Sequence, residues 1–122
     1  MKRAALFAGL FFLSVPGGAL AHATLASSQP ADGSVLTEAP TTVSLTFGGD
    51  VRLVSLLLKN AESADIPLLA EPPHDARRNI SASLPKLSPG GYSVEWRAAA
   101  KDMHAMSGVI QFTVAAPSVP DR

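Results

Sequence analysis

Apolar and polar residues alternate with a period of two in four stretches of the chain: 42–47, 80–84, 92–97 and 109–114. Successive side chains of a strand point to opposite faces of a sheet, so this period predicts half-buried β-strands. The stretch 51–58 is more continuously apolar. It favours a strand covered on both faces, with a short helical turn as the alternative. Because no long run has helical spacing, we expect an all-β protein.

Turn-forming residues separate these stretches. Signals of this kind lie at Pro30–Gly33, Ala39-Pro40, Phe47–Asp50, Glu71–Pro73 and Ser88–Gly91. Proline fixes its own φ and glycine tolerates positive φ, so each cluster is expected to end one strand before the next begins. About seven short strands in roughly 100 residues predict an immunoglobulin-like antiparallel β-sandwich with Greek-key connections, with a closed barrel as the alternative.

The stretch 61–78 interrupts this regular spacing. It carries four acidic residues and three prolines, a composition typical of a long surface loop. We expect a short strand around Ile66 to Leu69 within it. Arg77 and Arg78 are interpreted as solvated loop charges, and His74 as an exposed residue outside any functional site.

The first 21 residues have the pattern of a secretory signal peptide. Two basic residues at positions 2 and 3 precede an apolar run over 4–15, and the segment closes on Ala19-Leu20-Ala21. The predicted organisation is therefore a signal peptide over 1–21, a β-sandwich domain over 22–115 and a disordered tail over 116–122. We expect an exported monomer with no membrane span after signal cleavage.

Charge and cysteine content exclude several classes of function. The chain has 10 Lys+Arg against 10 Asp+Glu and no cysteine. A formal net charge of zero provides no basic surface for phosphates, so nucleic-acid binding is not expected. Without cysteine there is no disulfide framework and no thiolate metal site. Any metal must be bound by nitrogen, oxygen or thioether ligands.

His22 becomes the first residue of the mature chain if cleavage follows Ala21. An N-terminal histidine offers both its α-amine and its imidazole Nδ1 to the same ion. Two nitrogen ligands then come from one residue. Cleavage after Ala23 also satisfies the rule for small residues at the cleavage site, and it would remove His22 together with these two donors.

Asp102 and His104 are the second candidate pair. In an extended segment, residues two apart point to the same side, so both side chains can reach one ion. Together with His22 they provide three nitrogens and one oxygen, a set that suits Cu(II) in a tetragonal plane, with tetrahedral zinc as the alternative. An Asp-x-His pair in a loop is more often a hydrogen-bonded surface pair. The site therefore depends on the fold bringing His22 close to it.

Taken together, the motifs resemble the CopC family of periplasmic copper-resistance proteins, over nearly the whole mature chain. The matching segments are His22–Leu25, Ser28–Ser34, Ala39-Pro40, Val43–Phe47, Gly90–Arg97, Asp102–His104, Ser107-Gly108 and Phe112–Val114. The resemblance implies an immunoglobulin-like sandwich that binds one Cu(II) through the N-terminal amine, His22, Asp102 and His104. Where the family usually has glycine between the last two ligands, this chain has Met103, which a positive φ would strain.

The expected function is a copper-binding protein that captures one Cu(II) per chain and buffers it or passes it to a partner. The resemblance suggests an inner-membrane copper transporter of the CopD type as that partner. The chain is not expected to be an enzyme. Two alternatives remain at this point: a copper oxidase or monooxygenase with a histidine brace, and a metal-free structural β-sandwich.

Overall fold

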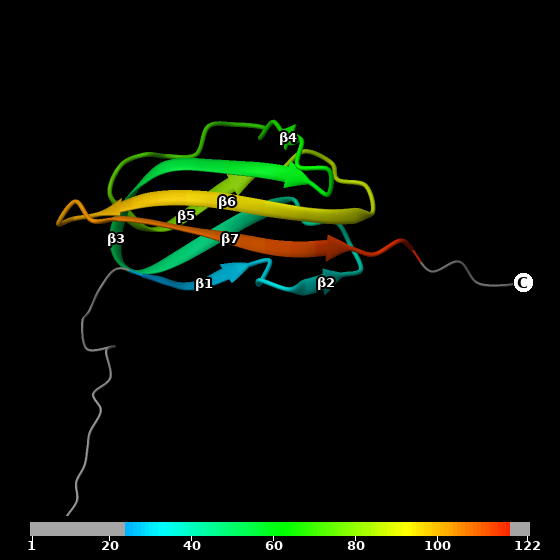
Figure 1. Ribbon diagram of the computed structural model, residues 1–122, viewed down its shortest axis with the longest axis horizontal. Helices are drawn as coiled ribbons and strands as arrows, with labels where there is room; N and C mark the ends of the chain where they lie inside the picture. Colours follow the sequence, from blue (N-terminus) through cyan, green and yellow to red (C-terminus); the bar gives the residue numbers. More distant parts are fainter. Residues whose placement is uncertain (1–23, 118–122) are drawn as a thin grey trace, which may run out of the picture.

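The computed structural model describes residues 24–117, which form seven β-strands and no helix (Figure 1). The strands are β1 (Leu25–Gln29), β2 (Ser34–Leu36), β3 (Thr42–Asn60), β4 (Asp65–Ile66), β5 (Arg77–Ser83), β6 (Gly90–Ala100) and β7 (Ala105–Val114). The predicted signal peptide and the tail residues 118–122 lie outside the described part of the chain. Within that part, no helix is long and apolar enough to cross a membrane.

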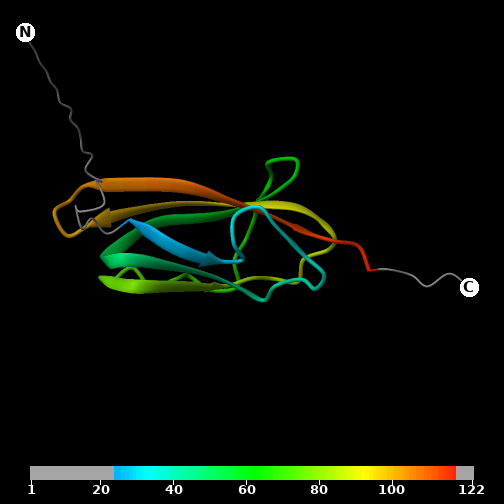
Figure 2. The same ribbon diagram turned by 90° about the horizontal axis from the view of Figure 1, so that it is seen from below.

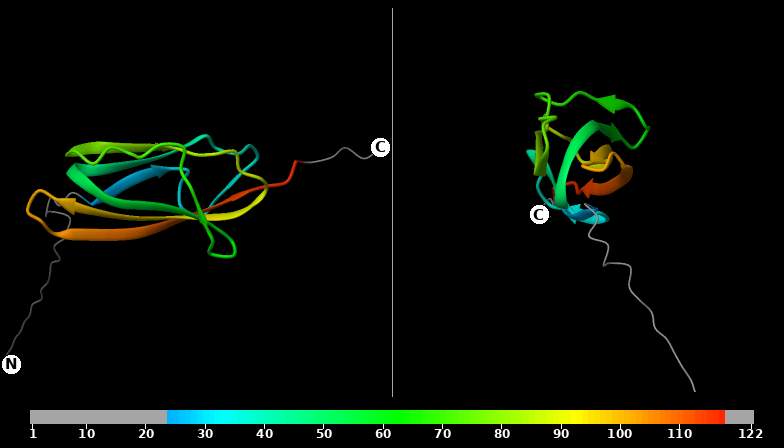
Figure 3. Two further views of the ribbon diagram at one scale, coloured as in Figure 1. Left: turned by 90° about the horizontal axis from the view of Figure 1, so that it is seen from above. Right: turned by 90° about the vertical axis from the view of Figure 1, so that its left-hand side faces the viewer.

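Strand β3 is the centre of the sandwich. Its first half pairs with β1 and β5, and its second half pairs with β6 and β4. Beyond β6, the sheet continues through β7 to β2. Figures 2 and 3 show β3 curving from one layer into the other, which confirms the predicted sandwich. The sheet is mixed rather than purely antiparallel, because β2 runs parallel to β7.

The prediction of a turn at Phe47–Asp50 is wrong. These residues belong to β3, which continues through them for 19 residues in all. Gly48 and Gly49 have no side chains to resist bending, and the pairing of β3 with β5 shifts register between Thr46 and Val51. The glycines therefore mark a bend within one strand rather than its end.

The core consists of the inward-facing side chains of both layers. The fully buried members with the largest side chains are Phe47, Leu45, Leu58, Ile80, Ile110, Val43, Val51 and Val94. Trp96 is buried as its alternation with Val94 predicts, and its ring meets Phe47 edge-on with 5.3 Å between centroids. It also lies over Gly108, where an added Cβ would approach the indole to 2.8 Å. Glycine at this position makes room for the only tryptophan.

The prediction that 51–58 is covered on both faces is also wrong. Val51, Leu53, Leu56 and Leu58 point into the core, but Val54 is 56% exposed and Leu57 is 42% exposed. The segment 68–74 lies beside this outer face without burying it, so the apolar run reflects a strand with only one fully buried face.

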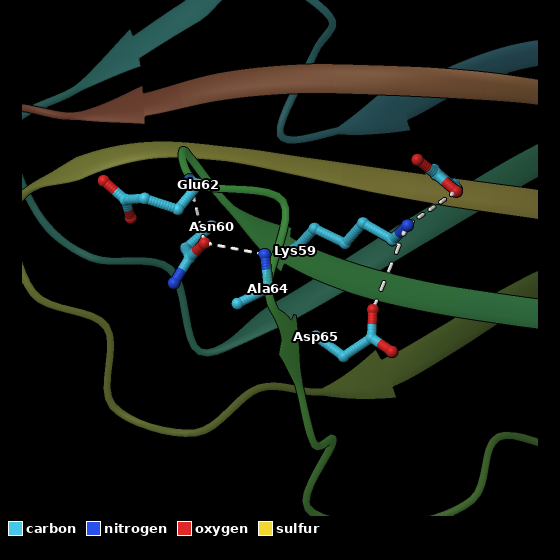
Figure 4. Close-up of polar contacts among 6 residues, drawn as sticks. Lys59, Asn60, Glu62, Ala64 and Asp65 are labelled. Carbon is cyan, nitrogen blue, oxygen red and sulfur yellow. Dashed lines mark hydrogen bonds and ion pairs between the residues drawn. The ribbon is translucent and has the colours of Figure 1, made fainter.

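The segment 61–78 is mostly irregular, as predicted, but its strands differ from the expectation. The short strand is Asp65–Ile66 rather than Ile66–Leu69, and Arg77 and Arg78 are exposed residues at the start of β5, not loop residues. Asn60 organises the turn into β4, because its Oδ1 accepts hydrogen bonds from the Glu62 and Ala64 amides at 2.9 and 3.0 Å (Figure 4).

Beside this turn, the Lys59 ammonium lies 3.5 Å from Glu95 and 4.0 Å from Asp65, which connects β3 to its neighbours on both sides (Figure 4). Just after β7, the Ala115 amide donates a hydrogen bond to the Leu36 carbonyl at 2.8 Å. This bond continues the parallel pairing of β2 and β7 just past the last strand.

Candidate metal centre

The tip of the hairpin between β6 and β7 holds two of the predicted ligands. The strands pair up to Ala99 and Ala105, and residues 101–104 form the turn between them. The Met103 amide donates to the Ala100 carbonyl at 2.8 Å, and the Ala100 amide donates to the His104 carbonyl at 2.9 Å. The backbone of the turn is therefore fixed by hydrogen bonds on both sides of Met103.

Asp102 and His104 are in direct contact at this tip. The Asp102 carboxylate accepts a hydrogen bond from the His104 backbone amide at 3.1 Å and contacts the His104 Nδ1 at 2.8 Å. Both side chains are exposed to solvent. The spacing of two residues thus brings the two candidate donors together, although through a local turn rather than through an extended segment.

The hydrogen bonds favour the ionised form of Asp102 and select one tautomer of the His104 ring. The side-chain contact with His104 is the largest cause, and the backbone amide the next, of an Asp102 pKa below its ordinary value. Since the carboxylate is an acceptor, His104 Nδ1 must carry a proton. In the neutral ring, Nε2 then carries the lone pair and is the nitrogen that can bind a metal.

Met103 adopts a left-handed conformation with φ of 72°. This is the conformation in which methionine, in the place of glycine, is strained. Such a conformation costs of order 1 kcal/mol in a residue with a Cβ. The Met103 side chain is 81% exposed, so packing does not compensate for this cost.

His22 lies outside the described residues, so its position relative to the hairpin is not defined. The described chain begins at Thr24, whose carbonyl accepts a hydrogen bond from the Gly48 amide at 2.9 Å. Leu25 pairs with Phe47, and Val51 on the same strand pairs with Ala100. The start of β1 and the β6–β7 hairpin therefore lie at the same end of the sandwich (Figures 1 and 2).

Residues 24–117 contain no cluster of three or more histidine, aspartate or glutamate residues that can hold a metal ion. The exposed pair at the hairpin tip offers one nitrogen and one carboxylate, a donor set that suits Cu(II) or zinc but is incomplete by itself. Asp102 and His104 therefore fit a copper site only if further ligands come from residues outside 24–117.

His74 is separate from this pair. Its side chain is half-exposed, as its place in a proline-rich loop predicted, but it also makes two polar contacts. Its Nδ1 contacts the Leu53 carbonyl at 2.7 Å and its Nε2 contacts the Glu71 carboxylate at 3.1 Å. The Leu53 carbonyl first, and Glu71 second, raise the pKa of His74 above its ordinary value. The sequence analysis predicted neither contact: Glu71 is three residues from His74, and Leu53 is 21 residues away.

Two curated proteins are similar to this chain in sequence. Copper transport protein CutJ of Bacillus subtilis is 30% identical over 110 residues, covering 86% of this chain and 20% of CutJ. Copper resistance protein C of Xanthomonas campestris pv. juglandis is 28% identical over 105 residues, covering 79% of this chain and 82% of the relative. The chain thus spans about a fifth of the first relative and most of the second.

Two solved structures have the same architecture. CopC from Methylosinus trichosporium OB3b superimposes with a TM-score of 0.68 at 23% identity, over 82% of this chain and 100% of that one. PcoC from Escherichia coli, a methionine-rich copper resistance protein, gives a TM-score of 0.61 at 28% identity, over 77% of this chain and 99% of that one. Residues 25–115 match the CopC domain. The chain therefore belongs to the CopC family of copper-binding and copper-resistance proteins, which are not enzymes.

Proposed function

We propose that the mature protein binds one Cu(II) through the N-terminal amine, His22, Asp102 and His104. The observation that carries this proposal is the proximity of Asp102 and His104 on an exposed hairpin tip, at the end of the sandwich where the described chain begins. Binding of both side chains to one ion requires the Asp102 carboxylate to exchange its contact with the His104 Nδ1 for the ion. An extended chain advances at most about 3.5 Å per residue, so a residue two positions before Thr24 lies within roughly 7 Å of it.

The donor set explains the choice of metal. Three nitrogens and one carboxylate oxygen in a plane match the preferred geometry of Cu(II), which also binds such donors more tightly than zinc does. Copper must displace the proton of the terminal amine, whose ordinary pKa is about 8. Affinity is therefore expected to rise with pH through the neutral range.

The proposed biological role rests on the exposed hairpin tip and on the predicted signal peptide. We propose that the protein is a periplasmic monomer that captures Cu(II) and buffers it or passes it to a membrane transporter of the CopD type. With four donors in the plane, no equatorial position remains open for oxygen. The protein is thus suited to carrying copper rather than to oxidative catalysis.

Native mass spectrometry of protein exported from the full precursor tests this proposal. One spectrum gives the mature N-terminus and, after one equivalent of Cu(II), the copper stoichiometry. A chain that begins at His22 and retains one copper is the expected result. A chain that begins at Thr24, or one that retains no copper, overturns the proposed ligand set.

Matched variants separate the site from general histidine binding. His104→Ala is expected to lose the retained copper, whereas His74→Ala removes a histidine elsewhere on the surface and is expected to keep it. Equal loss in both variants would contradict the proposed site. Competition with equimolar zinc distinguishes the two metals, and preferential retention of zinc would overturn the assignment to copper.

A further inference from the structure

The indole N–H of Trp96 is buried and has no hydrogen-bond partner within residues 24–117. The Trp96 side chain as a whole is only 5% exposed. Buried N–H groups of native proteins are almost always paired, because the hydrogen bonds to water that are lost on burial must be replaced. Two acceptors can do this here: an ordered water molecule, or a segment of the chain outside 24–117.

The Trp96 indole lies over β7 and against the other layer of the sandwich. A Cβ added at Gly108 would come within 2.8 Å of the Trp96 Nε1 and Cζ2 atoms. On its other side, the indole meets the Phe47 ring edge-on, and Phe47 pairs with Leu25. The unpaired donor is therefore located between β7 and the first residues of β1.

The part of β7 beneath the indole has no strand on its outer edge. Strand β2 pairs only with Phe112 to Val114, and the Gln111 backbone bonds to Gly33 and to the Asp32 side chain. From Ala105 to Ile110, no strand of the described chain follows this edge. Strand β1 lies in the opposite layer on the same side of the sandwich (Figures 1 and 2).

The residues just before Thr24 have the right length to pass the indole on the way to the hairpin tip. Three residues separate His22 from Leu25, and three separate Trp96 from Ala99, the last residue of β6 that pairs before the tip. At about 3.3 Å per residue, each span is roughly 10 Å. An extended segment that reaches the tip with His22 therefore passes the side of the sandwich on which the Trp96 N–H lies.

We propose that the Trp96 N–H donates a hydrogen bond to a backbone carbonyl of residues 22–23 in the mature protein. This bond holds the N-terminal segment beside the open edge of β7 and directs His22 toward the hairpin tip. Trp96 is then a positioning residue, which acts on the copper site through the N-terminal segment and not as a ligand. The inference rests on the proposed function in requiring a mature chain that begins at His22, but it requires no metal.

NMR of the copper-free mature protein tests the hydrogen bond directly. Trp96 is the only tryptophan, so its indole gives a single N–H signal. Scalar coupling across a hydrogen bond correlates the indole nitrogen with the carbonyl carbon that accepts its proton. Coupling to the carbonyl of His22 or Ala23 is the expected result, and coupling to any other carbonyl overturns the proposal.

Hydrogen exchange decides the case in which no coupling is detected. In a chain shortened to begin at Thr24, the indole proton should exchange about 10-fold faster than in the chain that begins at His22, because its acceptor is absent. Equal exchange rates in the two chains would assign the partner to an ordered water molecule and overturn the proposal. Urea unfolding of the shortened chain confirms that it is folded.

A single-atom replacement provides the matched control. Biosynthetic incorporation of 3-benzothienylalanine at position 96 replaces the indole N–H by sulfur and keeps the shape of the ring. The urea midpoint should fall in the chain that begins at His22 and stay unchanged in the chain that begins at Thr24, which already lacks the acceptor. Equal shifts in both chains would contradict the proposed bond.

Copper affinity measures the positioning role. In the chain that begins at His22, the sulfur analogue should lower Cu(II) affinity about 10-fold, as loss of an outer-shell partner commonly does. Equal affinities would overturn the role in positioning. The two proposals fail in different ways: coupling to residues 22–23 without copper retention would overturn only the proposed function, whereas copper retention without the hydrogen bond would overturn only this inference.

Discussion

Residues 24–117 contain two histidine–carboxylate pairs that resemble each other in sequence but differ in what the histidine can still do. At the hairpin tip, His104 uses Nδ1 to bind Asp102, and no described residue contacts its Nε2. In the segment 67–76, here called the strap, His74 uses both ring nitrogens, one for the Leu53 carbonyl and one for Glu71. Both partners of His74 are acceptors, so this ring is best satisfied when it is doubly protonated.

The difference shows that the second contact of a histidine decides its chemistry. A carboxylate on one nitrogen orients the ring and leaves the other nitrogen to a metal. Acceptors on both nitrogens stabilise the imidazolium, which cannot bind a metal. The raised pKa of His74 is consistent with this. Proximity of histidine and carboxylate in the sequence is therefore a poor guide to metal binding.

The largest expected effect on Cu(II) affinity comes from removing the His104 ring, whose Nε2 is free to bind a metal. His104→Ala should lower Cu(II) affinity by more than about 100-fold, because loss of even an outer-shell partner commonly costs 10- to 100-fold. Competition against a chromophoric chelator measures this change. Since Trp96 is the only tryptophan, quenching of its fluorescence by Cu(II) provides a second measure. His74→Ala is the control, and an equal effect of both variants would remove the distinction between the pairs.

Asp102→Asn should have the next largest effect. The amide retains an oxygen for the His104 Nδ1–H but loses the negative charge, so Cu(II) affinity should fall by about 10-fold. The same competition assay measures it. Glu71→Gln makes the corresponding change at the strap and should leave copper affinity unaltered. Unchanged affinity in Asp102→Asn would show that the carboxylate contributes neither as a ligand nor through orientation.

Replacing Met103 should relieve strain in the hairpin. Glycine tolerates a φ of 72° without a Cβ penalty, so Met103→Gly should stabilise the copper-free protein by up to about 1 kcal/mol. Urea unfolding measures the change in the free energy of unfolding. Met106→Gly, in regular β7, should destabilise the protein, and a destabilising Met103→Gly would contradict the strain argument.

The smallest expected effect is on the pH dependence of protein stability, through His74 in the strap. The folded-state pKa of His74 is raised above 6.5, so its stabilising contribution is complete below about pH 6.5 and is lost as pH rises through the folded pKa. His74→Gln should remove this part of the pH dependence, which begins near pH 6.5 and extends upward through the folded pKa. Calorimetric melting temperatures of copper-free wild type and variant test this, with His104→Gln as control. Parallel pH profiles for wild type and His74→Gln would refute it.

The fold was predictable for strands with one buried face, and less so for the bend at Gly48 and Gly49, where β3 passes from one layer to the other. The period of two identified β6, β7 and the first half of β3 because their inward residues form the core. Glycines 48 and 49 were mistaken for a turn, since the sequence does not distinguish a bend within a strand from its end. The exposure of Val54 was missed because the absence of a covering element is a property of the assembled sheet.

The candidate site was predictable only in its local part. Asp102 and His104 are two residues apart, so their contact depends on one turn of the chain. The contact between His74 and Leu53 joins residues that are 21 apart, and it exists only because the strap returns along β3. The position of His22 depends on how the chain approaches β1, and its role stays a prediction.

The passage of β3 through both layers has a consequence for unfolding. Each layer uses part of the same 19-residue strand, so the layers are joined by continuous backbone and not only by contact between side chains. Neither half of the sandwich can lose its strands without taking central pairings from the other. Amide protons of both layers should therefore exchange through a single global opening, and the sandwich should behave as one cooperative unit.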